Sequence, residues 1–157
     1  MVKIKKLDEL INLRKRWKQE GKKVVFTNGC FDILHLGHIK LFKFAKGLGD
    51  ILIVGVNSDS SIKKIKGSKR PIFPLNERLE VLEAIEYIDY LTVFEEETPL
   101  KLITSLLPDI LVKGGDWKPE QVVGGKEVEE AGGKVVIFPY VRGHSSSNII
   151  EKIKTLF

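Results

Sequence analysis

Short apolar runs rich in β-branched residues alternate along the chain with longer segments in which apolar residues recur at helical spacing. Five runs are expected to be buried strands: residues 24–27, 51–56, 90–94, 110–112 and 135–138. The helical pattern predicts helices at residues 7–17, 36–45, 75–85, 100–107, 119–131 and 146–156. The chain therefore alternates between strands and helices over almost its whole length.

This alternation indicates parallel strands joined by helical crossovers, because parallel neighbours need long connections. We expect an α/β fold: a single doubly wound, Rossmann-like domain with a five-stranded parallel sheet, covering residues 1–157. The N-terminal helix, within residues 1–21, should pack on it. In such sheets ligands bind beyond the carboxyl ends of the strands, so candidate chemistry is sought there.

Composition narrows the class of protein. The 157 residues suit one domain, and 43% apolar with 30% charged residues is typical of a folded chain. The apolar runs are too short to cross a membrane, and no secretory signal is visible. A single cysteine, Cys30, excludes an internal disulfide and a cysteine metal cluster. We expect a cytoplasmic protein.

The net charge of +5 favours an anionic partner without identifying it. Basic residues gather at 3–6, 14–18 and 63–70. The first two groups are interpreted as solvated helix faces. The third is expected in a loop rich in Gly, Ser and Pro, where an anion site is more plausible.

The first expected strand runs into a glycine-bearing turn that carries two histidines to the start of a helix. Its residues are Asn28-Gly29-Cys30-Phe31-Asp32-Ile33-Leu34-His35-Leu36-Gly37-His38. Backbone N–H groups and the helix dipole attract anions there, and histidines three residues apart can project from the same side. Gly37 removes a side chain that would keep a nucleotide from the backbone. This pattern favours phosphate binding over one histidine that caps the helix and another that faces solvent.

The run resembles the H-x-G-H signature of the nucleotidyltransferase superfamily, whose cytidylyltransferase branch carries a G-x-F-D-x-x-H-x-G-H pattern. The dinucleotide fingerprint G-x-G-x-x-G is absent after the first expected strand, which argues against a dehydrogenase. The resemblance implies a nucleotide site formed by Asn28, Gly29, Phe31, Asp32, His35, Gly37 and His38.

Three successive hydroxyls, Ser145, Ser146 and Ser147, stand at the start of the last expected helix. They can cap that helix or bind phosphate oxygens with its free N–H groups. The run resembles the superfamily's I-S-S-T-x-I-R signature, which in relatives holds the β and γ phosphates of a nucleoside triphosphate. Here His144 replaces the leading isoleucine and Ile150 replaces the arginine, so other residues must supply the positive charge.

Basic residues after the second expected strand are candidates for that charge. Lys66 and Arg70 are expected to bind the phosphates, whereas Lys63 and Lys64 are expected on a solvated face. Arg78 matches an arginine that contacts phosphate in relatives, or else forms a salt bridge with Glu77 or Glu80. Further candidates follow the second and fourth expected strands: Asn57, Asp59, Lys113, Gly114 and Asp116. Trp117 offers a face for a base or sugar, and Cys30 is interpreted as a packed side chain.

Residues 7–154 resemble most closely the adenylyltransferase domain of ADP-heptose synthase, which in many bacteria is fused behind a sugar kinase. The resemblance rests on these segments: Phe26-Thr27-Asn28-Gly29-Cys30-Phe31-Asp32-Ile33-Leu34-His35, Val56-Asn57-Ser58-Asp59, Lys66-Gly67, Arg70-Pro71, Phe94-Glu95-Glu96-Glu97-Thr98-Pro99, Leu107-Pro108-Asp109 and Val112-Lys113-Gly114-Gly115-Asp116. Asn28, Cys30, Tyr140 and Arg142 stand where cytidylyltransferases usually differ, which favours ATP over CTP.

The resemblance implies that ATP and D-glycero-β-D-manno-heptose 1-phosphate are joined to give ADP-heptose and pyrophosphate, for lipopolysaccharide core synthesis. It implies His35 and His38 at the α and β phosphates, Lys66 and Arg70 at the phosphates, and Ser145 to Ser147 at the β and γ oxygens. Asp32, Lys113 and Asp116 would orient the sugar phosphate, ribose or nucleotide. It also implies Mg²⁺ held mainly by the triphosphate, a separate heptose kinase, a homodimer, and neither nucleic acid nor membrane as a partner.

Two alternatives remain open. Within the same class, the chain is a cytidylyltransferase or another nucleotidyltransferase that acts on glycerol 3-phosphate or another small phosphate. In a different class, suggested by the basic charge, it is a non-catalytic module that binds nucleotides or nucleic acid. The paired histidines count against the second alternative, since binding alone does not require imidazoles at that turn.

Overall fold

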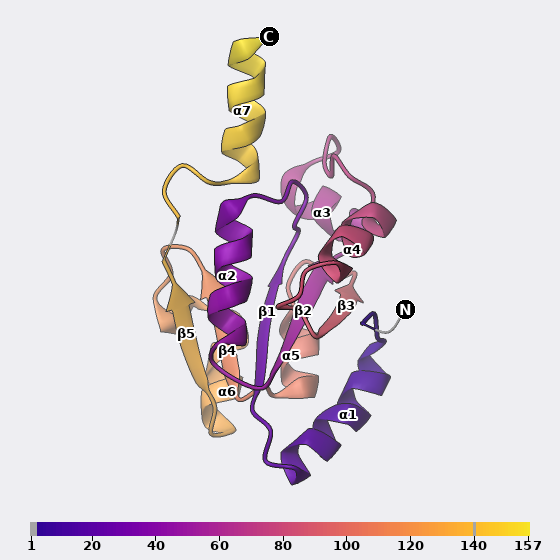
Figure 1. Cartoon of the computed structure of the whole chain (residues 1–157), viewed down its shortest axis with the longest axis vertical. Helices are drawn as coiled ribbons and strands as arrows, with labels where there is room; N and C mark the ends of the chain where they lie inside the picture. The colour runs from indigo at the N-terminus through magenta and orange to yellow at the C-terminus, as the bar shows by residue number, and fades with distance from the viewer. Residues whose placement is uncertain (1–2, 140) are drawn as a thin grey trace.

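The computed structural model describes residues 3–139 and 141–157, so the expectation drawn from Tyr140 lies outside the described residues. Five strands form one parallel sheet in the order β3-β2-β1-β4-β5, as expected (Figure 1). They are β1 (Val24–Gly29), β2 (Ile51–Asn57), β3 (Tyr90–Phe94), β4 (Ile110–Gly114) and β5 (Lys134–Phe138). The helices are α1 (Leu7–Gln19), α2 (Leu36–Lys46), α3 (Asp59–Lys66), α4 (Leu75–Glu83), α5 (Leu100–Leu106), the 3₁₀ turn η1 (Pro119–Gln121), α6 (Gly125–Glu130) and α7 (Ser146–Leu156).

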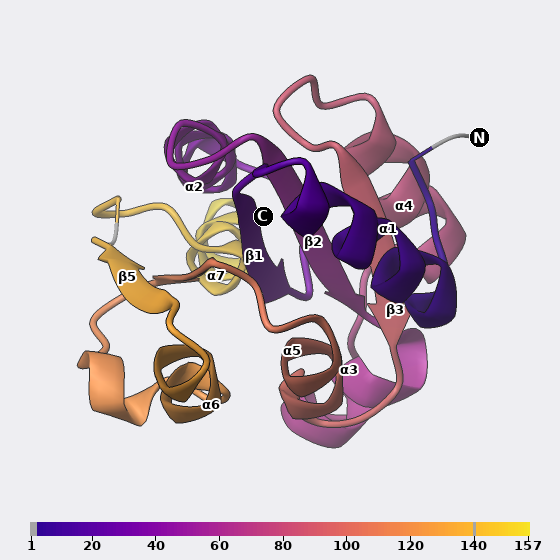
Figure 2. The ribbon, with the colours of Figure 1, turned by 90° about the horizontal axis from the view of Figure 1, so that it is seen from below.

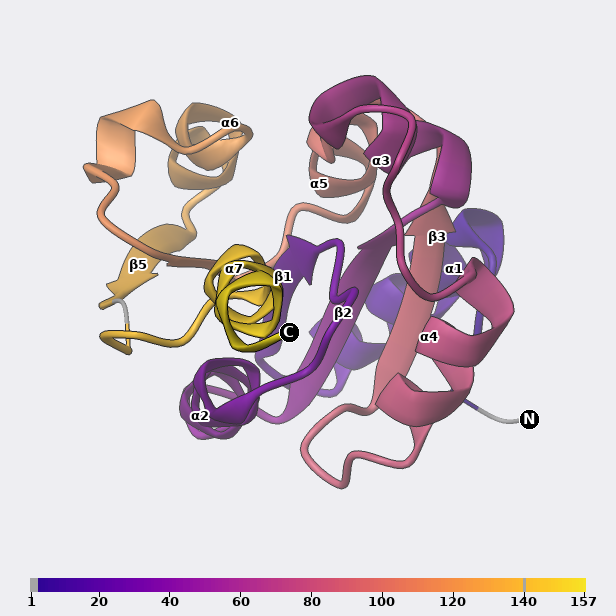
Figure 3. The same ribbon diagram turned by 90° about the horizontal axis from the view of Figure 1, so that it is seen from above.

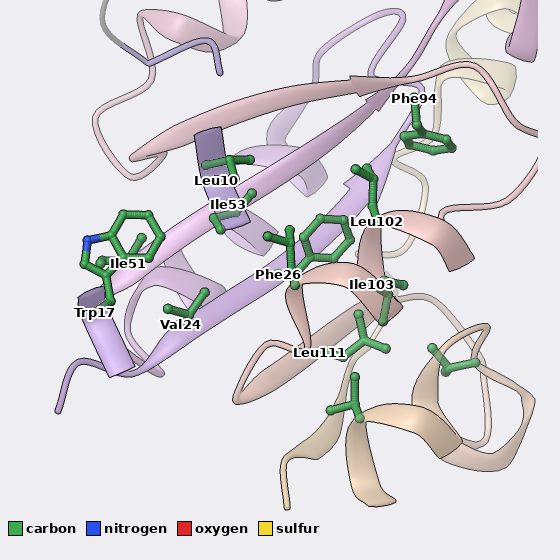
Figure 4. Packing of buried hydrophobic residues seen from close by; sticks show 13 residues of the cluster. Leu10, Trp17, Val24, Phe26, Ile51, Ile53, Phe94, Leu102, Ile103 and Leu111 are labelled. Carbon is green, nitrogen blue, oxygen red and sulfur yellow. The ribbon is translucent and has the colours of Figure 1, made fainter. Parts of the chain in front are cut away.

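Successive residues of the central strands point to opposite faces, and each face carries its own apolar core. Val24 and Phe26 of β1 pack under α1, α5 and α6, whereas Val25 packs under α2 and α4. Helices cover both faces of the sheet, as expected for a doubly wound fold (Figure 2). Figure 4 shows the first core, to which α1 contributes Leu10 and Trp17 and α5 contributes Leu102 and Ile103.

The order in which strands are added to the sheet changes direction at the neighbouring strands β1 and β4. It passes from β1 to β2 and β3 on one side, then returns to place β4 and β5 on the other. β1 and β2 pair over the whole of β1, from Val24–Ile51 to Gly29–Val56, but β1 and β4 pair only at Val25–Ile110 and Phe26–Leu111. The two strands therefore separate before their carboxyl ends, at the switch point where such folds bind ligands.

Two expectations about secondary structure are wrong. Residues 63–66 belong to α3 and not to a loop, so only residues 67–70 of that basic group lie in a loop. The helix begins at the Ser58 cap, whose hydroxyl accepts from the Ser61 N–H, and it buries Ile62 completely. The helix is only eight residues long and has only two apolar residues, Ile62 and Ile65, which is too little to indicate a helix in the sequence.

The expected helix at 119–131 is divided into η1 and α6. Gly124 between them has a φ of +82°, a backbone angle that residues other than glycine rarely adopt. A Cβ at this position would lie 2.6 Å from the Ile103 Cγ2 atom. The close packing of this turn on α5 explains the break.

Helix α7 extends away from the rest of the chain beyond the carboxyl ends of the strands (Figures 1 and 3). Its first turn is tied to the loop after β1, because the Ser146 hydroxyl donates to the Ile33 carbonyl at 2.9 Å. Farther along, Ile153, Leu156 and Phe157 are exposed. Within the described residues, every helix is too short or too polar to span a bilayer.

Candidate active site

A cleft of about 390 Å³ lies at the carboxyl ends of β1, β4 and β5, between the N-termini of α2 and α7. Most of the site residues expected from the sequence line it: Asn28, Gly29, Phe31, Asp32, His35, Gly37, His38, Lys66, Lys113, Gly114, Ser145, Ser146 and Ser147. The two histidines and the serine run, which are far apart in the sequence, thus meet in one cavity.

The His35 and His38 imidazoles are oriented by the start of α2. His35 is the N-cap, and its Nδ1 accepts the Gly37 N–H at 3.1 Å. The Nδ1 of His38 accepts the His35 N–H at 3.3 Å, and the two ring centroids are 3.8 Å apart. When Nδ1 accepts, the proton of a neutral imidazole is on Nε2. Each ring therefore offers an Nε2–H donor.

Both rings are held neutral by their surroundings. Burial, the neighbouring His35 and the Lys66 ammonium lower the pKa of His38 to about 3. Burial and the nearby His144 also lower the pKa of His35. Near neutral pH both imidazoles are therefore neutral and can donate a hydrogen bond.

This neutrality predicts a pH dependence of stability. Between pH 6.5 and the folded pKa of about 3, unfolded His38 takes up a proton that the folded chain excludes. The free energy of unfolding should therefore fall as the pH is lowered through this window, by up to about 1.4 kcal/mol per pH unit from this residue. Urea denaturation at pH 7, 6 and 5 measures it, with His38→Gln as the matched control. Equal pH slopes in the two proteins would contradict the assignment.

Gly37 leaves room for the His35 ring. A Cβ at Gly37 would lie 2.9 Å from the His35 Cε1 atom and 3.0 Å from its Nδ1. The expectation that this glycine keeps a nucleotide's path to the backbone clear is therefore incomplete, since the nearest group that a side chain would displace is the imidazole itself.

Gly37→Ala is accordingly expected to rotate the His35 ring away from its position. Displacing a substrate-positioning group by up to about 1 Å commonly lowers the rate by up to about 100-fold, so kcat/KM should fall by about 10- to 100-fold. Steady-state kinetics in the assay described below measures the change. Gly47→Ala, at the other end of α2, is the matched control, because its Cβ would come no closer than 3.4 Å to the Phe44 carbonyl oxygen. A loss as large in the control would point to the helix and not to His35.

Asp32 holds the loop that follows α3. Its buried carboxylate accepts the N–H groups of Ile72 and Phe73 at 2.8 and 2.9 Å and the Arg70 Nε at 3.1 Å. Burial acts to raise the pKa of Asp32, but these hydrogen bonds outweigh it and lower the pKa below its usual value. The carboxylate is thus engaged with the protein, and it shapes the cleft by positioning this loop beside Lys66.

Five expected site residues do not line this cleft: Asn57, Asp59, Arg70, Arg78 and Asp116. Arg78 is 2% exposed and donates to the carbonyls of Phe73, Cys30 and Asn57 and to Asp59. The expected salt bridge of Arg78 with Glu77 or Glu80 is replaced by one with Asp59 at 2.8 Å. Asp116 is exposed.

A second cavity of about 350 Å³ adjoins the first and shares Asn28, Gly29, Cys30 and Lys113 with it. It extends over Asn57 and Thr98 to Trp117. Burial lowers the pKa of Lys113, whose ammonium lies 5.4 Å from the centre of the Trp117 ring. Burial raises the pKa of Cys30, so its thiol is protonated near neutral pH. The residue is half-buried and lines both cavities, which differs from its interpretation as a packed side chain.

The sequence analysis did not include His144 among the site residues. It lines the cleft, and its ring stacks on that of His35 with centroids 6.2 Å apart and an angle of 26° between the planes. The only signal in the sequence was its position directly before the serine run.

The donor set of the cleft bears on a metal ion. No group of three or more His, Cys, Asp or Glu side chains that could hold one occurs among residues 3–139 and 141–157. Both histidines use Nδ1 as an acceptor and the Asp32 carboxylate is occupied. These residues are therefore better suited to a metal ion that is coordinated mainly by oxygen atoms of a bound ligand than to one coordinated by protein side chains.

Comparisons with known proteins point to one family. A family model described as cytidylyltransferase-like matches residues 26–153. Among curated relatives, the bifunctional protein HldE of Citrifermentans bemidjiense is 55% identical over 96% of this chain, and that of Proteus mirabilis is 54% identical over 87%. The chain spans 31% and 29% of the length of these two relatives.

Two solved structures are also similar. A lipopolysaccharide core biosynthesis protein from Thermoplasma volcanium is 34% identical, with a TM-score of 0.62, and the match covers 76% of this chain and 97% of that one. A pantoate-β-alanine ligase from Francisella tularensis shares the fold, with a TM-score of 0.65 at 17% identity, covering 99% and 80% of the two chains.

Proposed function

Because the chain belongs to the cytidylyltransferase-like family, we propose that it is an adenylyltransferase that joins ATP and D-glycero-β-D-manno-heptose 1-phosphate into ADP-heptose and pyrophosphate. One observation carries the proposal: the imidazole donors of His35 and His38 and the Ser145 to Ser147 hydroxyls converge in one cleft at two helix N-termini. Such an arrangement suits a polyphosphate.

In the proposed reaction, an oxygen of the sugar phosphate attacks the α-phosphorus of ATP in line with the departing pyrophosphate. The bond from the α-phosphorus to the bridging oxygen breaks, and that electron pair leaves with pyrophosphate. The nucleophile is already ionised at neutral pH, so no general base is needed. The protein then contributes positioning and stabilisation of the charge that develops on the phosphates.

The residues divide this work. The Nε2–H donors of His35 and His38 would contact the α and β phosphates, Lys66 would neutralise charge there, and the serines would bind the β and γ oxygens. Arg70 stays a candidate for the phosphates. Its Nε is bonded to Asp32, while its Nη2 has no hydrogen-bond partner among residues 3–139 and 141–157.

The two adjoining cavities suit two anionic substrates. We place the nucleotide in the first cavity and the sugar phosphate in the second, with Lys113 between them, because Lys113 lines both. The apolar surroundings that lower the pKa of Lys113 make its ammonium costly to bury alone, so a phosphate beside it would be favourable. Asp116 would act only from outside this region, and Asn57 lines the second cavity.

We propose that Mg²⁺ enters bound to the triphosphate, where it would offset negative charge on the leaving pyrophosphate. The protein's own residues would orient that complex through the donors described above. This agrees with a cleft rich in N–H and O–H donors and poor in free carboxylates.

Support for the sugar comes from the segments that resemble ADP-heptose synthase and from the similarity to a lipopolysaccharide core biosynthesis protein. We further propose that residues 1–157 work as one cytoplasmic nucleotidyltransferase domain, and that a heptose kinase acting before it supplies the sugar phosphate. Neither nucleic acid nor a membrane is proposed as a partner.

The decisive experiment offers the purified protein ATP or CTP with a panel of acceptors: heptose 1-phosphate, glucose 1-phosphate and glycerol 3-phosphate. Pyrophosphate release is followed, and the nucleotide sugar is identified by mass. Fast release only with ATP and heptose 1-phosphate is expected. Release with CTP or glycerol 3-phosphate would favour the other transferases, and salt-sensitive oligonucleotide binding without any release would favour a binding module.

We also propose a homodimer. Ile153 and Leu156 of α7 and Phe157 directly after it are 51%, 64% and 102% exposed and lie at helical spacing on a helix that extends from the body. Exposed apolar stripes of this kind commonly mark contact surfaces. Light scattering should give twice the mass of 17.8 kDa, and Ile153→Asp should reduce it to that of one chain. A monomeric wild type would contradict the proposal, and Glu151→Ala serves as a control on the opposite, polar side of α7.

A further inference from the structure

The cleft contains a third imidazole that the proposed mechanism does not use. His144 directly precedes Ser145, the N-cap of α7, and lies against the cleft with the three serines. His35 is paired with His38 at 3.8 Å and with His144 at 6.2 Å, measured between ring centroids. His35 is therefore a neighbour of both other histidines, and His144 lies on the serine side of the site.

The serine side is short of positive charge. Lys66 and Lys113 are the only lysines or arginines among the described residues that line the cleft. Arg70 does not line the cleft and its Nε is bonded to Asp32, while Arg78 is paired with Asp59. The signature arginine of the superfamily is Ile150 in this chain. A triphosphate bound here would have its terminal phosphate close to hydroxyls but without the cation that relatives place there.

We propose that His144 is a further phosphate-binding residue, whose imidazole contacts the terminal phosphate of the bound nucleoside triphosphate in place of the signature arginine. The inference rests on the proposed function, since it requires a triphosphate in the first cavity. Imidazole suits this position because it donates an N–H when neutral and carries a positive charge when protonated.

The backbone around His144 is fixed without help from its side chain. The His144 N–H donates to the Val141 carbonyl at 3.0 Å, and the Ser145 hydroxyl caps α7 by accepting the Asn148 N–H at 3.0 Å. Gly143 has φ +80°, which sets the turn into this segment. Replacement of the imidazole should therefore leave the serines in place, so that its own contribution can be measured.

The test compares binding of ATP and ADP, by calorimetry with Mg²⁺ present, to the wild type and to His144→Ala, His144→Gln and His144→Arg. His144→Ala is expected to weaken ATP binding by about 10- to 100-fold, the usual effect of losing one hydrogen bond to a charged group, and ADP binding by less than about threefold. His144→Gln should recover part of the loss, and His144→Arg most of it.

Lys152→Ala is the matched control. It removes a full positive charge from α7 at an exposed residue that does not line the cleft, so ATP binding should change by less than about threefold. Unchanged ATP binding in His144→Ala, an equal loss for ATP and ADP, or an equal loss in Lys152→Ala would overturn the inference. Failure of the wild type to bind ATP would instead overturn the proposed function.

Discussion

His38→Ala is expected to lower kcat by about 100- to 1000-fold, the effect of removing one preorganised donor to developing charge. The His38 ring is fixed before substrate arrives, by its hydrogen bond with the His35 N–H and by edge contact with Phe31 at 5.3 Å between centroids. Burial, His35 and Lys66 lower the pKa of His38 to about 3, so the ring meets the substrate as a neutral donor near neutral pH. Steady-state pyrophosphate release at saturating ATP measures the change.

The effect should lie in kcat more than in ATP affinity, because the donor is aimed at charge that grows during the reaction. His38→Gln, which keeps an N–H donor of similar reach, should recover part of the rate. Thermal unfolding of both variants checks that the fold persists. Turnover of His38→Ala within about threefold of the wild type would exclude a role in stabilising the transition state.

Arg78→Ala is expected to lower the free energy of unfolding by about 3–5 kcal/mol, because three carbonyls would each lose a hydrogen bond to a charged donor, at about 1–3 kcal/mol per unsatisfied buried group. The Arg78 guanidinium joins the loop after β1, the end of β2 and the loop before α4 through the carbonyls of Cys30, Asn57 and Phe73. Those carbonyls would lose their partner in the alanine variant. The ion pair with Asp59 adds little, since that carboxylate is 40% exposed.

Urea denaturation of Arg78→Ala beside Glu80→Ala, an exposed neighbour on α4, measures this difference. The same pair of variants decides between the structural role and the phosphate contact implied by resemblance. A large loss of stability supports the structural role. A normal denaturation curve with greatly weakened ATP binding would show that Arg78 turns toward the ligand.

The elements whose sequence pattern is strong were predictable. The run at β2 has one apolar residue after another up to Val56 because both faces of this strand of the parallel sheet are covered. The H-x-G-H run was recognised because glycine and histidine have few structural reasons to occur at that spacing before a helix. The family model that matches residues 26–153 confirms that resemblance.

What the sequence concealed depended on contacts between distant segments. No local pattern shows that the Asp32 carboxylate accepts hydrogen bonds from residues 70–73, or that Arg78 donates to the Cys30 carbonyl. The partners are 40 positions apart for Asp32 and Ile72 and 48 positions apart for Arg78 and Cys30. Helix α3 was missed because it is short and mostly polar, and it is held in the fold by the complete burial of one residue, Ile62. His144 was missed because only the folded chain brings its ring near that of His35, from which it is distant in the sequence.

The short ladder between β1 and β4 has a consequence for recognition. Because these strands pair at only two positions, the ladder between them stops at Phe26 and Leu111, before their carboxyl ends. Main-chain amide and carbonyl groups that face the gap beyond these residues can form hydrogen bonds with polar atoms of a bound substrate. Part of the selectivity for substrate would then come from hydrogen bonds with the main chain, and single side-chain substitutions would not remove that part.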